Sequence, residues 1–73
     1  MTAYELAKKV NEQLTRHNLK KIPPQMVYQY VSKGYIPSYV ENGQSLIDNE
    51  TATLWTQWYV GKRVHTAAAT STK

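Results

Sequence analysis

The chain has 73 residues, of which 41% are hydrophobic and none is cysteine. This length provides a single domain, and the absence of cysteine excludes disulfides and thiolate metal sites and fits a cytosolic protein. The formal charge of +4 permits a polyanionic partner. No apolar run approaches the roughly 20 residues of a membrane span and no signal-peptide pattern is present, so we expect no membrane partner.

The first predicted helix begins at the N-terminus, where Thr2 and Glu5 form a Thr-x-x-Glu capping box. Apolar residues then recur on one face out to about His17, which predicts an amphipathic helix packed on the core. Charged residues on the other face lie at i,i+4 spacing, and we expect them to pair with one another. These pairs are Glu5–Lys9, Lys8–Glu12 and Glu12–Arg16.

A short connector carries Lys20 and Lys21 directly before the second predicted helix. A lysine pair in a loop is normally just solvated. At the N-terminus of a DNA-binding helix, however, it would hold flanking phosphates beside the positive end of the helix dipole. We therefore assign Lys20 and Lys21 to phosphate contact.

The stretch from Ile22 to Pro37 contains a start signal, a two-faced helix and a stop signal. Pro24 suits the first helical position, where its missing N–H is not needed. Gly34 suits the left-handed conformation just past the last turn, and Pro37 prevents the helix from continuing. One face of this helix is apolar or small, with Val27, Tyr30, Val31 and Gly34.

The opposite face of this second helix carries only amide, hydroxyl and amine groups. A merely solvated face usually carries both Glu and Lys, whereas this face has no acid. Hydrogen-bond donors and acceptors with one cation suit base edges and the phosphates beside them. We therefore predict a DNA recognition helix with these contact residues: Gln25, Tyr28, Gln29, Ser32 and Lys33.

The segment from Tyr35 to Ile47 is predicted to be a two-stranded hairpin, because Asn42-Gly43 tolerates the positive φ angles of a type I′ turn. We expect its β-prone segments at Tyr35-Ile36 and Leu46-Ile47. Two strands are not stable alone and must pack against helices. The fold class is therefore mainly α with a small β-hairpin, in the order helix–helix–hairpin–helix, which describes a winged helix-turn-helix.

A third helix is predicted from Asp48, a good N-cap, to about Val64. The winged-helix domain would then span residues 1–64, and the small polar residues 65–73 would form a flexible C-terminal tail. The third helix has more apolar residues than one stripe can use. Leu54 and Trp58 form a second line, which either packs in the domain's own core or is exposed as a subunit or partner contact.

Two segments carry a resemblance to a known family. The stretch PPQMVYQYVSKGYIP, followed by YVENGQSLIDNETA, resembles the excisionases of temperate phages, also called recombination directionality factors, which have a MerR-like winged-helix fold. The resemblance covers roughly Ile22 to Trp55. The tyrosine-rich, cysteine-free composition is similar to that of mycobacteriophage excisionases in particular.

This resemblance implies a function without catalysis. Several copies would bind side by side on double-stranded DNA at the phage attachment site, bend it, and direct the phage integrase toward excision in the cytoplasm of the bacterial host. The recognition helix would enter the major groove. The wing would enter the minor groove through Asn42, Gly43 and Gln44.

The sequence departs from the family in two places. Its first helix and connector are longer than the compact helix-turn-helix of these proteins. The wing also lacks the basic residue often found at its tip, and Glu41 stands next to the turn.

Catalysis is not indicated, because His17 and His65 lie far apart in the sequence and neither has a nucleophile nearby. Two distant histidines also give no metal-ligand spacing. We expect no enzyme activity, no metal and no cofactor.

Two other functions remain open. One is a small phage transcriptional regulator of the same fold, which a long apolar helix after the wing would favour; the short third helix expected here favours the excisionase. The other is a protein-interaction module without nucleic-acid binding. The salt dependence of binding separates that module from a DNA-binding protein.

Overall fold

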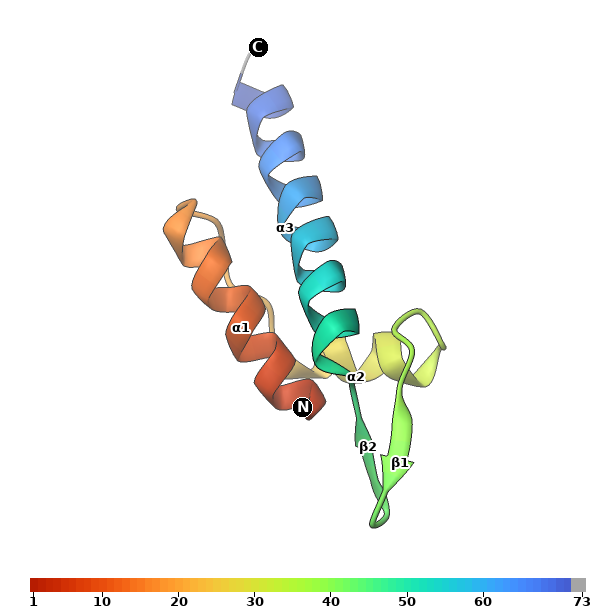
Figure 1. Cartoon of the computed structure of the whole chain (residues 1–73). Coiled ribbons are helices and arrows are strands. Elements are labelled where there is room, and N and C mark those ends of the chain that lie inside the picture. The colour runs from red at the N-terminus through yellow and green to blue at the C-terminus, as the bar shows by residue number, and fades with distance from the viewer. Residues whose placement is uncertain (72–73) are drawn as a thin grey trace.

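The computed structural model describes the backbone of residues 1–71 and the side chains of residues 1–67. Three helices and one antiparallel hairpin follow the order α1–α2–β1–β2–α3 (Figure 1). This confirms a mainly helical chain with a small two-stranded hairpin between the second and third helices. The element bounds are α1 Ala3–Arg16, α2 Pro24–Ser32, β1 Tyr39–Glu41, β2 Gln44–Leu46 and α3 Asn49–Ser71.

Both ends of α1 are closed by local signals. Thr2 Oγ1 accepts a hydrogen bond from the Glu5 backbone N–H at 3.2 Å, and Glu5 Oε1 accepts one from the Thr2 N–H at 3.0 Å, which confirms the capping box. The bonds from the Thr2 backbone N–H and hydroxyl lower the pKa of the Glu5 carboxyl. At the other end Asn18 takes a left-handed φ of 54°, and the Leu19 N–H reaches the Leu14 carbonyl at 2.8 Å in a Schellman motif.

The core lies where α1 and α3 run side by side and α2 crosses them (Figure 1). The helix α1 contributes the predicted apolar face, and Val27 from α2 is fully buried against it. The largest fully buried side chains are Leu6, Leu14, Ile36, Ile47, Val10 and Val27. The predicted i,i+4 ion pairs on the outer face of α1 do not form among the described side chains.

One side chain of α1 fixes the connector that leads into α2. Asn11 Nδ2 donates to the Ile22 carbonyl at 3.0 Å, and Asn11 Oδ1 accepts from the Ile22 N–H at 2.8 Å. Both backbone groups of Ile22 are thereby satisfied where its side chain enters the core. The start of α2 is consequently held at a set distance from the middle of α1.

The C-terminal end of α2 is a second Schellman motif. Gly34 has a φ of 81°, the Gly34 N–H bonds to the Val31 carbonyl at 3.1 Å, and the Tyr35 N–H bonds to the Tyr30 carbonyl at 2.9 Å. This confirms the predicted role of Gly34. It also explains why the strand predicted at Tyr35-Ile36 is wrong: these residues complete the helix end, and Ile36 is buried in the core.

The hairpin is shorter than predicted. The strands pair with Tyr39 opposite Leu46 and Glu41 opposite Gln44, and Asn42 and Gly43 have φ angles of 51° and 75°. The predicted type of turn at Asn42-Gly43 is therefore present.

The base of the hairpin is tied to the start of the chain. The Ile47 N–H donates to the Met1 carbonyl at 2.6 Å, and the Met1 amine donates to the Ile47 carbonyl at 2.7 Å. The Ile47 side chain is buried beside this pair. Backbone bonds and apolar packing thus hold the hairpin at its base, while its strands are largely exposed.

The third helix is longer than predicted. Asp48 is its N-cap, as expected, since Asp48 Oδ2 accepts from the Glu50 N–H at 3.2 Å. The predicted end at Val64 is wrong, because the helix continues to Ser71. No Gly or Pro stop signal follows Val64, and alanine is the strongest helix former. Residues 65–71, assigned to a flexible tail, are therefore helical, and residues 72–73 lie outside the described part.

The Asn11 clamp leads to a stability prediction. Replacing Asn11 by Ala leaves the Ile22 N–H and C=O without partners, so the free energy of unfolding should fall by roughly 1–3 kcal/mol. Urea unfolding followed by circular dichroism measures this change. Gln13→Ala is the matched control, because Gln13 is another partly exposed amide of α1 and should change stability by less than about 0.5 kcal/mol. Equal effects of the two substitutions would contradict the clamp.

Candidate nucleic-acid interface

The polar face of α2 is open to solvent along its whole length. All five residues predicted to contact DNA are exposed: Gln25, Tyr28, Gln29, Ser32 and Lys33. The opposite face is closed, because Val27 is buried and Tyr30 and Val31 are half-buried. Gly34, expected on the closed face, is exposed and belongs to the helix end instead. The helix therefore presents an uninterrupted surface of amide, hydroxyl and amine groups without a carboxylate.

The lysine pair before α2 is exposed on a backbone that is held from two sides. Arg63 Nη2 of α3 donates to the Lys20 carbonyl at 3.4 Å, and the Asn11 side chain holds Ile22 just beyond Lys21. Arg63 Nη1 in turn donates to the Tyr59 hydroxyl at 2.9 Å. The connector thus leaves both lysine side chains free next to the N-terminus of α2.

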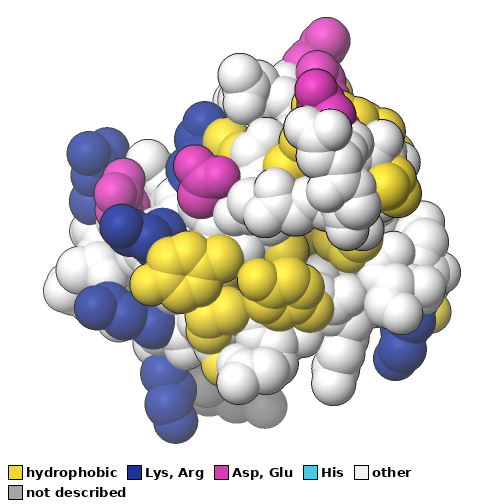
Figure 2. Space-filling model, turned by 90° about the horizontal axis from the view of Figure 1, so that it is seen from below, with side chains coloured by type: hydrophobic (Ala, Val, Ile, Leu, Met, Phe, Trp, Pro, Cys, Tyr) yellow, Lys and Arg dark blue, Asp and Glu magenta, His cyan; other side chains and the backbone are white. Residues whose placement is uncertain are grey.

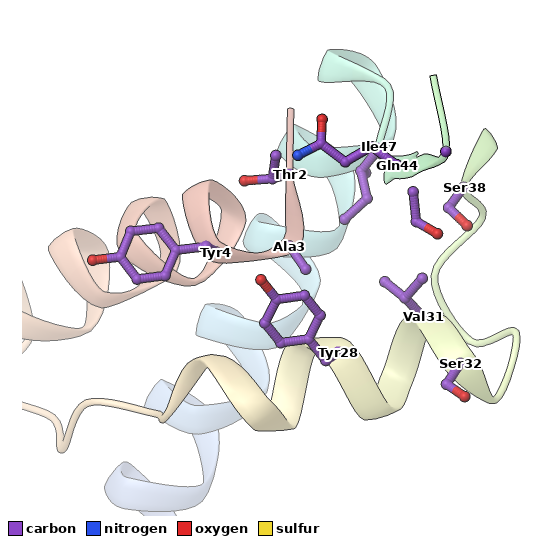
Figure 3. A pocket seen from close by; sticks show the side chains of 11 residues that line it. Thr2, Ala3, Tyr4, Tyr28, Val31, Ser32, Ser38, Gln44 and Ile47 are labelled. Atoms are coloured by element: carbon purple, nitrogen blue, oxygen red, sulfur yellow. The ribbon is translucent and has the colours of Figure 1, made fainter. Parts of the chain in front are cut away.

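The hairpin tip and part of α2 border the same hollow of the surface. Gly43 and Gln44 line a groove of about 650 Å³ together with Tyr28 and Ser32 (Figure 3). Asn42 is exposed at the turn beside them. The structure thus brings the predicted wing residues and two predicted helix residues to one site. Gln25, Gln29, Lys33 and the lysine pair lie outside the groove lining.

Figure 2 views the face toward which the hairpin projects. Hydrophobic side chains, among which tyrosine is counted, gather in its middle. Lys and Arg side chains lie mainly to one side, with acidic side chains between them and at another edge. Positive charge thus flanks the central hydrophobic area rather than covering it.

Sequence reasoning did not identify the start of α1 as part of this site. Tyr4 is 54% exposed and lines the groove, as do Ser38 and Ser45 from the hairpin segment. The only hint in the sequence is that Tyr4, although aromatic, does not belong to the apolar face of its helix. Its proximity to α2 depends on how α1 and α2 cross, which no local pattern encodes.

A separate aromatic area lies on α3. Trp55 stacks on Tyr59 with ring centroids 5.1 Å apart and meets the edge of Tyr30 at 5.7 Å. Leu54 and Trp58 are 60% and 56% exposed. Of the two alternatives for this line, burial in the domain's own core is therefore wrong. Lys62 Nζ lies 5.2 Å from the centre of the Trp58 ring, a cation–π contact that covers only part of it.

Comparison of the chain with protein-family models, with curated proteins and with solved structures found no match. Within residues 1–71 no helix has the length and apolar character needed to cross a membrane. The described part of the chain also contains no group of three or more His, Asp or Glu side chains placed to hold a metal ion.

The turn at the hairpin tip gives a prediction with an internal control. Gly43→Ala forces an alanine into a φ of 75°, which should lower the free energy of unfolding by about 1–2 kcal/mol. Gly61→Ala, in the exposed middle of α3 with open space around it, should instead raise it by roughly 0.5–1 kcal/mol. Thermal and urea unfolding measure both. A stabilising Gly43→Ala substitution would contradict the left-handed turn.

Proposed function

We propose that this protein is a sequence-specific, non-catalytic DNA-binding protein of the winged-helix type. In this proposal α2 enters the major groove and the tip of the hairpin enters the adjacent minor groove. One observation carries it: Tyr28 and Ser32, from the exposed, acid-free face of α2, border the same groove as Gly43 and Gln44 of the hairpin.

The chemistry of the exposed groups supports DNA as the partner. A single glutamine amide, such as that of Gln25 or Gln29, can make two hydrogen bonds to one adenine, at its N6 and N7 positions. Lys33 and the lysine pair before α2 suit phosphates, and the formal charge of +4 favours association with a polyanion. A face selected only for solubility would carry acids among these groups.

We propose excision control as the role of this DNA binding. The protein would act as a phage excisionase, binding in several copies at the attachment site, bending the DNA and directing integrase toward excision. The exposed Leu54 and Trp58 lie one turn apart on α3 and suit a contact with a neighbouring copy on DNA or with the integrase. The sequence resemblance to phage excisionases supports the same role.

The length of α3 favours a second candidate, a dimeric transcriptional regulator with the same fold. The expectation of a short third helix had counted against this candidate, and α3 in fact has 23 residues. A dimer formed along this helix would need its apolar stripe to continue. Beyond Trp58, however, the same side of the helix carries Gly61, Lys62 and His65. The stripe therefore suits a local contact better than a long paired helix.

Footprinting with a gel assay of DNA bending separates these two candidates. On a fragment carrying the attachment site, ordered occupancy of several adjacent sites with a strong bend is the result expected for an excisionase. A single palindromic footprint would instead identify the regulator.

The salt dependence of binding tests the DNA partner itself. The duplex is first selected from random sequences by the wild-type protein. Three to six phosphate contacts then predict that a plot of log affinity against log salt concentration has a slope of roughly −3 to −5. Lys21→Ala or Lys33→Ala should weaken binding to all sequences and flatten the slope by about 1. Gln29→Ala should lose roughly 1–3 kcal/mol and relax base preference. Lys62→Ala, on the far part of α3, is the charge-matched control.

A slope near zero for the wild-type protein would refute DNA binding and favour the protein-interaction module. If Lys33→Ala changed sequence preference alone, its assignment to phosphate would be wrong.

The exposed patch on α3 gives a separate prediction. Trp58→Ala should leave affinity for a single-site duplex unchanged and reduce cooperativity on DNA with several adjacent sites, because Trp58 is exposed and does not line the groove. Titrations of one-site and three-site fragments measure the two quantities. Equal losses on both fragments would show that Trp58 stabilises the fold rather than joining copies.

A further inference from the structure

Three segments far apart in the sequence line the groove beside α2: the start of α1, the exposed side of α2, and the hairpin with the residues just before it (Figure 3). Apart from Thr2, whose hydroxyl is bonded to Glu5 in the cap of α1, its hydroxyl and amide groups come from Tyr4, Tyr28, Ser32, Ser38, Gln44 and Ser45. In Figure 3 Tyr4 and Tyr28 lie toward one end of the groove, with the Tyr4 ring directed away from the other labelled side chains, and Ser32 and Ser38 lie toward the other end. Hydrogen-bonding groups are therefore spread along the groove.

The lining of the groove is uncharged and mixes hydroxyl and amide groups with the apolar side chains of Ala3, Val31 and Ile47. None of the described residues that form it carries a carboxylate or a cation. Within residues 1–67, the hydroxyls of Tyr4 and Tyr28 have no hydrogen-bond partner, so both are available to a ligand. Glu5, next to Tyr4 in the chain, accepts bonds from the Thr2 N–H and hydroxyl, which hold its carboxylate in the cap of α1.

In the proposed docking, one sugar–phosphate strand of the DNA passes between α2 and the hairpin. In B-DNA a major groove of about 12 Å and the neighbouring minor groove of about 6 Å are separated by one sugar–phosphate strand. A helix in the first and a hairpin tip in the second must therefore straddle that strand. Phosphate oxygens accept hydrogen bonds from Ser, Tyr and Gln side chains, and all three kinds are present in the lining of this groove.

We infer that this groove seats one sugar–phosphate strand of the duplex and that Tyr4 of α1 contacts DNA there, opposite Tyr28 of α2. The inference rests on the proposed function and deepens it by adding α1 to the DNA-binding surface. Neutral donors in the groove fix the register of the duplex, while the lysines outside it supply the charge. Tyr4 thus joins the interface as a positioning contact to the backbone and does not read bases.

Single-phosphate substitution combined with hydroxyl deletion tests this assignment. Methylphosphonates, which remove the charge of one phosphate, are placed one at a time on each strand of the selected duplex. Wild-type affinity should fall at every contacted phosphate, including those held by the lysines, and one or two adjacent phosphates on one strand should owe a roughly tenfold loss to the groove, the loss of a hydrogen bond to a charged group. Tyr4→Phe should weaken binding to the unmodified duplex about 3–10-fold and abolish the sensitivity at one of these phosphates.

Tyr28→Phe should act in the same way at a phosphate on the same strand. Tyr35→Phe is the matched control: Tyr35 is also exposed but lies outside the groove, and its substitution should change nothing. Circular dichroism and thermal unfolding of Tyr4→Phe should match those of the wild type, because the side chain is half exposed. Ser38→Ala is an independent probe at the other end of the groove. It should abolish the sensitivity to methylphosphonate substitution at a different phosphate.

The failures are distinguishable. If the wild-type protein selects and binds a duplex while Tyr4→Phe, Tyr28→Phe and Ser38→Ala all behave like Tyr35→Phe at every phosphate, the groove assignment is wrong and DNA binding stands. If the wild-type protein selects no duplex, the proposed function itself is wrong, and the groove assignment is refuted with it.

Discussion

The bidentate contact between Asn11 and Ile22 is the constraint on which the remaining geometry depends. It satisfies both backbone groups of a residue whose side chain is buried, and so fixes where α2 starts relative to α1. The Schellman motif at Gly34 then fixes where α2 ends. With Val27 buried between these two points, the helix cannot rotate, and its polar face must remain outward.

The hairpin depends on a different kind of support. Its strands are short and largely exposed, so they gain little from apolar burial. Its position is set by the backbone bonds between Met1 and Ile47, by the burial of Ile47, and by the glycine turn. The groove between the hairpin and α2 therefore results from two anchored elements, each fixed by a few local interactions.

Local signals in the sequence were sufficient for most of the elements. The capping box, Gly34, the Asn42-Gly43 turn and the Asp48 cap each act within a few residues, and each appears as expected. Two boundaries were wrong because a competing local effect prevailed: the helix end recruited Tyr35 and Ile36, and α3 met no stop signal after Val64. The contribution of Tyr4 to the groove was not predictable, since it depends on the crossing of α1 and α2. The exposure of Trp58 likewise follows from which side of α3 the other helices cover.

The connector before α2 has a thermodynamic consequence. Arg63 holds the Lys20 carbonyl and Asn11 holds Ile22, so the backbone around both lysines is already ordered in the free protein. A loop that orders only when it meets a polyanion loses backbone entropy at that step, and the loss subtracts from affinity. Here only the lysine side chains remain to be restricted. In the proposed complex with DNA, Arg63 would therefore contribute to affinity without a contact of its own, by ordering the backbone of the two lysines in advance.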